Sequence, residues 1–290
     1  LSSALEAFSA SGEPILVQSP CYIGFIHTLN NLGRKIIDSP LKKEDNWAMD
    51  YEDIEKKIIK HNIHFAIFCS PHNPTGRVWK KEELLNIGDI CLKHNVIVVA
   101  DEIHADFVYH GHQHQVFANL KTEYQEITVT CTAPSKTFNI AGLQVSNIFI
   151  ANENLRKKFK QELKKTANAD INVMGLIACQ AAYSQGEDWL RQVKIYIAEN
   201  LEYVKTFLRD NLPQVKLVEP EGTYLLWLDF RELNLTEEEL EDLIINKAKL
   251  WLDGGTMFGT EGVGFQRINI ACPQKILIQA FTQLEEALKQ

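Results

Sequence analysis

Apolar residues occur along the chain in two kinds of run. Short β-branched or aromatic runs bounded by turn residues indicate buried strands, whereas apolar residues spaced three and four apart indicate amphipathic helices. Helical spacing occupies residues 22–33, which end at Gly33, and residues 80–95. Strand-like runs occupy residues 13–20, 34–41, 64–71, 96–103, 126–133 and 145–152. Strands that alternate with helices predict an α/β fold with a mostly parallel sheet covered on both faces.

The second half of the chain has a different pattern. A long helical tract runs from residue 187 to 212 and stops before Pro213. An αβ unit follows, with strands expected at 224–230 and 265–271 and helices at 236–249 and 275–290. This change predicts two domains, a large domain at residues 1–186 and a smaller C-terminal α+β domain at residues 187–290.

Composition narrows the class of protein. The 290 residues are 45% apolar and 23% charged, enough to bury one or two cores. A net charge of −8 with scattered basic residues argues against nucleic acid or an anionic membrane as the partner. No membrane-length apolar run and no basic signal-peptide region is present, so we expect a cytoplasmic protein that binds a small molecule. The six cysteines include no C-x-x-C pair that would indicate a zinc site.

Polar residues follow three of the predicted strands. Asn73 follows the first, Asp101 and His104 follow the second, and Ser135 and Lys136 follow the third. Taken singly, Asn73 is typical of a turn and Asp101 of a cap on the following segment. His104 alone would be a hydrogen-bonded rim histidine, and Lys136 alone a solvated surface lysine. The carboxyl ends of parallel strands meet at one edge of a sheet, where ligands bind. Together, the residues therefore predict one pocket that holds an amide, a carboxylate and a lysine.

Four motifs carry a resemblance to a known family. They are SPHNPTGRVW at 70–79, VVADEIHADF at 98–107, APSKTFNIAGLQ at 133–144 and FQRINIACP at 265–273. They resemble the fold-type I, aspartate aminotransferase-like enzymes that depend on pyridoxal 5′-phosphate, within the class I/II aminotransferase superfamily. The resemblance is strongest to the cystathionine β-lyase-like C–S lyases of the MalY/PatB type. It covers nearly the whole chain and implies that the family's N-terminal segment lies upstream of Leu1.

The resemblance implies roles for the strand-end residues. Lys136 resembles the lysine that holds the cofactor covalently and then removes the substrate Cα proton, which requires a deprotonated amine. Asp101 resembles the acid that keeps the cofactor's ring nitrogen protonated, because a buried carboxylate attracts that charge. Asn73 would donate from its amide to the cofactor's phenolic oxygen and contact the substrate.

Four further residues receive roles from the same resemblance. Tyr22 matches an aromatic residue that stacks on the cofactor beside the substrate, although a packed core tyrosine is an alternative. His104 stands where aminotransferases commonly carry tyrosine and is typical of the lyase branch. Ser135 would bind the phosphate. Arg267 would bind the substrate α-carboxylate, although a rim arginine in a surface ion pair is the alternative.

Two other segments contain residues of kinds that bind ligands in other proteins. Many aminotransferases carry Gly-x-Arg where this chain has residues 142–144, Gly-Leu-Gln, so the phosphate is expected to bind backbone N–H groups upstream of Leu1. His110, His112 and His114 alternate as strand ligands of a metal would, but the resemblance requires no metal and we expect a solvated loop.

The resemblance leaves three functions open. The first is α,β-elimination of L-cystathionine or a related cysteine S-conjugate, giving a thiol, pyruvate and ammonia. Aminotransfer is the second, because it uses the same lysine and acid. The third is a non-catalytic module that lacks its phosphate site. By analogy with relatives we also expect a homodimer and cis peptide bonds before Pro20 and Pro74.

Overall fold

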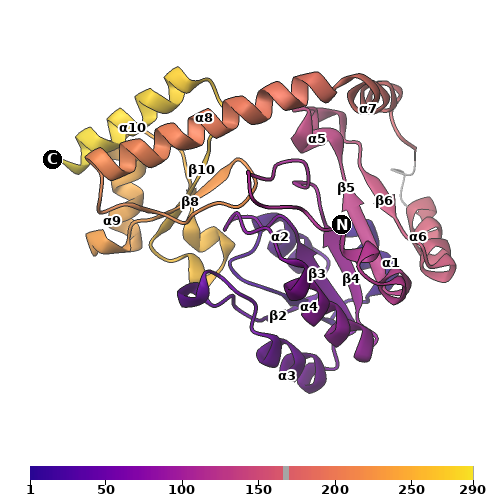
Figure 1. Ribbon diagram of the computed structural model, residues 1–290. Helices are drawn as coiled ribbons and strands as arrows, with labels where there is room; N and C mark the ends of the chain where they lie inside the picture. The colour runs from indigo at the N-terminus through magenta and orange to yellow at the C-terminus, as the bar shows by residue number, and fades with distance from the viewer. Residues whose placement is uncertain (166–169, 290) are drawn as a thin grey trace.

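The computed structural model describes residues 1–165 and 170–289, which form two β-sheets (Figure 1). The strand order of the large sheet is β2-β1-β3-β4-β5-β6, and only β6 runs antiparallel to its neighbour. Its strands are β1 (Pro14–Val17), β2 (Lys35–Asp38), β3 (Phe65–Cys69), β4 (Ile97–Asp101), β5 (Thr128–Thr132) and β6 (Asn147–Phe149). The predicted α/β fold with a mostly parallel sheet is confirmed.

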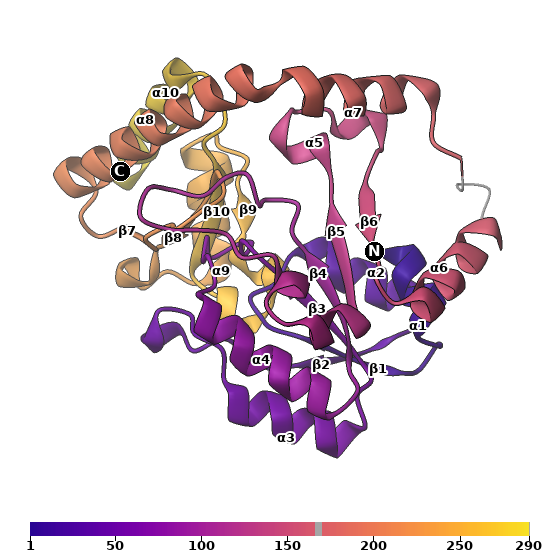
Figure 2. The same ribbon diagram turned by 45° about the vertical axis from the view of Figure 1, so that its right-hand side comes forward.

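Helices cover both faces of the large sheet (Figure 2). One face packs against α3 (Tyr51–His61) and α4 (Lys81–Lys93), and the other against α1 (Ser2–Phe8), α2 (Ile23–Asn31) and α6 (Glu153–Lys165). Side chains of a strand point alternately to opposite faces. Ala66 and Phe68 of β3 accordingly join the α3 and α4 core, whereas Phe65, Ile67 and Cys69 join the core of α1, α2 and α6.

The second sheet has the strand order β7-β8-β10-β9 and is antiparallel. Its strands are β7 (Lys216–Leu217), β8 (Leu225–Asp229), β9 (Asp253–Gly254) and β10 (Phe265–Asn269). The helices α8 (Glu187–Asn211) and α10 (Gln274–Leu288) pack on its outer face. We propose the domain boundary at the start of α8, where the sequence pattern changes.

Several helices differ from the sequence expectation. The helix expected at 236–249 is divided into α9 (Glu237–Glu241) and a π-helical segment at Asp242–Lys247. The helices α3, α6 and α7 (Val173–Gln185) were not predicted. Cis peptide bonds precede Pro20 and Pro74, as expected, and also Pro71.

The inner face of the second sheet packs on the core of the first. Trp227 of β8 and Phe265 of β10 stack with their ring centroids 5.2 Å apart, and both belong to the core that contains Ile54 and Leu84 of α3 and α4. Trp47, which precedes α3, meets the edge of Phe265 at 5.6 Å. Because this core is continuous, the two sheets are held in one relative position. None of the helices in the described ranges combines the length and apolar character that a bilayer crossing demands.

Two adjacent isoleucines of α3 test this assignment of buried and exposed faces. Ile58 is 2% exposed and Ile59 is 63% exposed. Ile58→Ala should lower the free energy of unfolding by about 2–5 kcal/mol, because it leaves a cavity in the core. The matched Ile59→Ala change should cost less than about 0.5 kcal/mol. Urea unfolding measures both, and equal losses would contradict the packing of α3.

Candidate active site

A cavity of about 160 Å³ lies beyond the carboxyl ends of β3 and β4, facing the second sheet. It is lined by Tyr22, Cys69, Asn73, Asp101, Ile103, His104, Lys136, Tyr224, Leu225, Arg267 and Asn269. Six of the seven residues predicted from the sequence thus meet there. Ser135 is the exception, because it neighbours Lys136 in the short helix α5 (Pro134–Thr137) without lining the cavity. A second cavity of about 270 Å³ shares Lys136, Tyr224 and Asn269 with the first.

Strand geometry places the acid and the amine together. Asp101 is the last residue of β4, and Lys136 lies in α5, directly beyond the neighbouring strand β5. Pro134 begins α5, a position where the missing N–H is not needed. The next turn is fixed by Thr137, whose buried hydroxyl donates to the Asp106 carboxylate over 2.7 Å. The helix that carries Lys136 is therefore attached to the loop that follows β4.

Asp101 is a carboxyl group without a cationic partner. Its hydrogen bond comes from the Ile103 N–H at 3.3 Å, and it forms no ion pair within the described part of the chain. Burial raises the pKa of the Asp101 carboxyl to about 6, against a usual value near 4. Lys136 likewise has no hydrogen bond or ion pair among the described residues, so both groups are available to a ligand.

His104 is held in its neutral form. Burial lowers the pKa of its imidazole to about 3, and the nearby Lys136 and Arg267 charges act in the same direction. Its Nδ1 atom is buried and has no hydrogen-bond partner in the described structure. The ring meets the edge of Tyr224 with centroids 5.7 Å apart. At neutral pH, His104 therefore contributes an uncharged polar surface to the cavity.

Arg267 joins the two sheets across the cavity. Its Nη1 donates to Asn73 Oδ1 over 2.7 Å, and its Nε and Nη2 donate to Asp253 Oδ2 over 3.1 and 2.6 Å. A guanidinium carries five N–H donors, so two remain for a carboxylate ligand. The Arg267 side chain is 12% exposed, and the Asp253 side chain that pairs with it is 42% exposed, so this ion pair lies at the rim of the cavity and the carboxylate-binding role of Arg267 stays a proposal.

Three polar residues in or beside the cavity were not predicted from the sequence. Asn269 lies two residues after Arg267 on the same strand, and this period of two places both on one face of the sheet. The spacing could have identified Asn269. Tyr224 immediately precedes β8, and Asp253 accepts hydrogen bonds from Arg267 at the edge strand β9. Strand pairing in the second sheet brings both residues to the site, and no motif in the neighbouring sequence predicts that pairing.

The histidine-rich loop is only partly solvated. His110 and His112 are exposed, as expected, but the His114 side chain is 10% exposed. Its Nε2 lies 3.0 Å from Glu102 Oε2, and the other Glu102 oxygen accepts from the Phe117 N–H over 3.0 Å. The expectation of a solvated position is therefore wrong for His114, because the buried Glu102 draws its ring inward.

The cavity fits the ring of pyridoxal phosphate. A half-buried carboxyl that forms no ion pair with the described residues suits a protonated ring nitrogen, and the Lys136 amine, which also has no partner among them, suits the cofactor's aldehyde. The cations that line the cavity are Lys136 and Arg267, and the resemblance assigns both to other tasks than binding the phosphate. The phosphate partners expected upstream of Leu1 therefore stay a prediction.

Comparisons with known proteins agree with this geometry. The sequence profile of the family "aminotransferase class I and II" matches residues 1–283. Cystathionine β-lyase PatB of Bacillus subtilis (strain 168) is 42% identical, over 99% of this chain and 75% of the relative. Cystalysin from Treponema denticola, whose structure contains pyridoxal 5′-phosphate, superposes with a TM-score of 0.96 at 38% identity, over 99% of this chain and 73% of that chain. The PLP-bound C–S lyase from Staphylococcus hominis superposes with a TM-score of 0.91 at 32% identity, over 100% of this chain and 75% of that chain.

The raised pKa of Asp101 gives a pH-dependent prediction for the cofactor-free protein. The folded pKa lies above the unfolded one, so the stability linked to this proton is complete below about pH 4 and is lost as the pH rises through about 6. Asp101→Asn should therefore make the cofactor-free protein more stable at pH 7 and change its stability much less at pH 4. Urea unfolding at both pH values measures this.

Asp188→Asn is the matched control. Hydrogen bonds from Arg191 lower the pKa of the exposed Asp188 carboxyl, so this change should bring no gain at pH 7. An Asp101→Asn effect that is the same at pH 4 and pH 7 would contradict the buried, unpaired carboxyl.

Proposed function

The chain belongs to the aminotransferase class I and II family, and we propose that it is a pyridoxal phosphate-dependent C–S β-lyase acting on L-cystathionine or a related cysteine S-conjugate. One observation carries the proposal: the cavity unites Lys136, Asp101 and Arg267 at the edge of the sheet. The lyase relatives support it across nearly the whole chain. In the overall reaction, the S-conjugate and water give a thiol, pyruvate and ammonium.

Each residue of the cavity has a defined task in this proposal. Bound pyridoxal phosphate supplies an electron sink for the charge that develops at the substrate Cα. Lys136 holds the cofactor and, as a free amine, takes the Cα proton. Asp101 holds a proton at the ring nitrogen, and Tyr22 lines the cavity beside the ring. The two remaining N–H groups of Arg267 bind the substrate carboxylate.

The breaking C–S bond requires little further help. A thiol has an unperturbed pKa near 8.5, so a thiolate can leave without a strong general acid. The neutral His104 is consistent with this, because its low pKa leaves no proton to donate at neutral pH. Elimination is therefore compatible with a cavity in which Lys136 is the proposed base and no strong general acid faces the leaving group.

We also propose that the protein is a homodimer. Four neighbouring apolar residues of α7 are between 55% and 69% exposed, namely Val173, Met174, Leu176 and Ile177. An apolar patch of this kind on a folded protein marks an interaction surface. The homodimer expected from the resemblance supplies a second copy to cover it. The cytoplasmic location stays a prediction from the sequence.

Adding L-cystathionine without a keto acid tests the proposed reaction. The PLP-loaded protein should release pyruvate, and Lys136→Ala should reduce the rate by a factor of about 100 or more, because it removes the base. A coupled lactate dehydrogenase assay measures the pyruvate. Strict dependence on 2-oxoglutarate would favour aminotransfer, and the absence of a lysine-dependent visible band after adding cofactor would favour a non-catalytic module.

Substitutions in α7 test the proposed dimer. Met174→Glu combined with Ile177→Glu should raise the dimer dissociation constant about tenfold or more, because charge replaces buried apolar area. Ile59→Glu, on the distant α3, is the matched control at a similarly exposed isoleucine and should leave the dimer intact. Light scattering at several concentrations measures the mass. A monomeric wild-type protein would refute the dimer.

A further inference from the structure

Two loops that border the cavity contact each other backbone to backbone. The loop at residues 70–79 joins β3 to α4 and carries Asn73, while residues 220–224 lead into β8 and carry Tyr224. The N–H groups of Glu221 and Gly222 both donate to the Gly76 carbonyl over 2.9 Å. Gly76 has a φ of +74°, and a Cβ there would lie 3.1 Å from Pro220. This approach therefore requires glycine at position 76.

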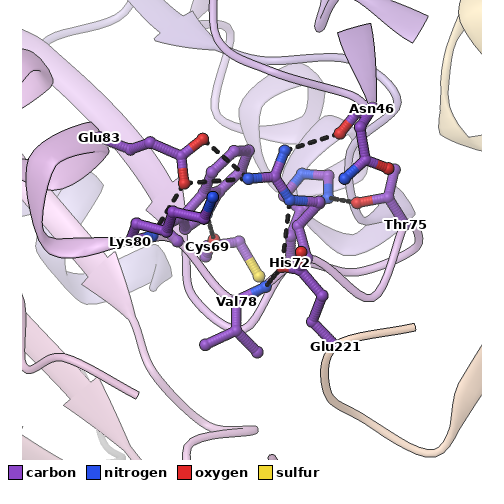
Figure 3. A network of polar contacts seen from close by, with 10 residues as sticks. Asn46, Cys69, His72, Thr75, Val78, Lys80, Glu83 and Glu221 are labelled. Atoms are coloured by element: carbon purple, nitrogen blue, oxygen red, sulfur yellow. Dashed lines mark hydrogen bonds and ion pairs between the residues drawn. The ribbon is translucent and has the colours of Figure 1, made fainter. Parts of the chain in front are cut away.

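A buried charge network fastens these two loops (Figure 3). Arg77, whose side chain is 5% exposed, donates from Nε to Glu221 Oε2 over 3.1 Å and from Nη2 to both Glu83 oxygens over 2.8 and 2.9 Å. Its Nη1 donates to the Asn46 carbonyl over 2.6 Å. Glu221 Oε2 also accepts from the Val78 N–H over 2.7 Å. We call the ion pair of Arg77 and Glu221 the clasp.

A third segment that borders the cavity is joined to residues 221–223 by backbone hydrogen bonds. The Tyr109 N–H donates to the Glu221 carbonyl over 3.0 Å, and the Thr223 N–H donates to the Phe107 carbonyl over 2.8 Å. Residues 104–109 follow β4 and begin with His104. The three fastened segments thus supply Asn73, His104 and Tyr224 to the cavity.

We propose that Arg77 and Glu221 are positioning residues for the substrate carboxylate site. Asn73 comes from the first sheet's loop and Arg267 from the second sheet, and their 2.7 Å hydrogen bond requires the correct relative position of both. Tyr224 lies three residues after Glu221 and contacts His104 across the same boundary. The clasp keeps Asn73 against Arg267, which directs the two remaining guanidinium N–H groups into the cavity. This inference rests on the proposed role of Arg267.

Removing one partner of a buried ion pair leaves the other without its counter-charge. Arg77→Lys keeps the charge but cannot reproduce the bonds to three separate acceptors, because an ammonium lacks the planar fork. Glu221→Gln is the milder change, since its amide oxygen can still accept from the Val78 N–H. If the lysine variant fails to fold, the glutamine variant carries the test.

The experiment compares steady-state kinetics of the PLP-loaded variants on L-cystathionine. We expect KM to rise about tenfold or more with kcat within about threefold, because carboxylate binding is weakened while Lys136 is untouched. The cofactor's visible absorbance should not change. Lys205→Gln, which breaks an exposed ion pair with Glu219 close to the same turn, is the control and should leave KM unchanged.

Ligand binding separates positioning from a general loss of stability. In both clasp variants, the affinity for an unreactive S-alkyl-D-cysteine should fall about tenfold, whereas the affinity for the matching S-alkyl cysteamine, which lacks the carboxylate, should not change. A lower melting temperature with unchanged KM and unchanged ligand affinities would overturn the inference. If the wild-type protein releases no pyruvate, the proposed lyase function fails, while the ligand comparison still decides the role of the clasp.

Discussion

The hydrogen bond between Arg267 and Asn73 spans 194 positions of the sequence and lies where the two sheets meet. It can form only because the inner face of the second sheet packs on the core of the first, through Trp227 and Phe265. The core fixes the distance between the sheets, and the polar contacts at its rim then set the shape of the cavity. Apolar packing of this kind permits little sliding, since interiors are as dense as organic crystals. The cavity is therefore a property of the boundary between the sheets.

Burial shifts the pKa values of two groups in that cavity in opposite directions. Asp101 carries a raised pKa because burial disfavours its charge, and His104 a lowered one for the same reason. Burial thus disfavours the charged form of both groups, so that His104 is neutral at pH 7 whereas Asp101, with a pKa of about 6, ionises at a cost in stability. A cationic heterocycle beside Asp101 would offset the desolvation penalty of its carboxylate, because opposite charges attract most strongly where water is excluded. It would not favour a charged His104. Strongly shifted pKa values in a cleft are typical of functional sites, and here desolvation is the largest cause of both shifts.

Residues that surround the cavity-lining side chains hold those side chains in place. Asp253 fixes Arg267 from one side and Asn73 from the other, which leaves the guanidinium little freedom. Arg77 and Glu221 act one step further out, where glycine at position 76 allows two backbones to touch. Such supporting contacts matter because a bound carboxylate is recognised by donors placed in advance. In the proposed reaction, Lys136, Asp101 and Arg267 act on the cofactor and substrate, and these outer contacts are proposed to hold Arg267 in position.

The sequence by itself determined the elements and the chemistry at the strand ends. Apolar runs of strand length are local signals, and a polar residue at the end of such a run or a few positions beyond it lies near the sheet's edge, which is why Asn73, Asp101 and Lys136 line one cavity. The helix α3 is amphipathic and could have been recognised, whereas the one buried residue of α7 is Gly175, so α7 gives no pattern of buried apolar positions. Only the tertiary structure decided that Asp253 and Tyr224 join the site, that Glu102 draws His114 inward and that Arg77 pairs with Glu221. These contacts join residues between 12 and 144 positions apart, and their partners are selected by how sheets and loops pack, for which a single sequence carries no periodic signal.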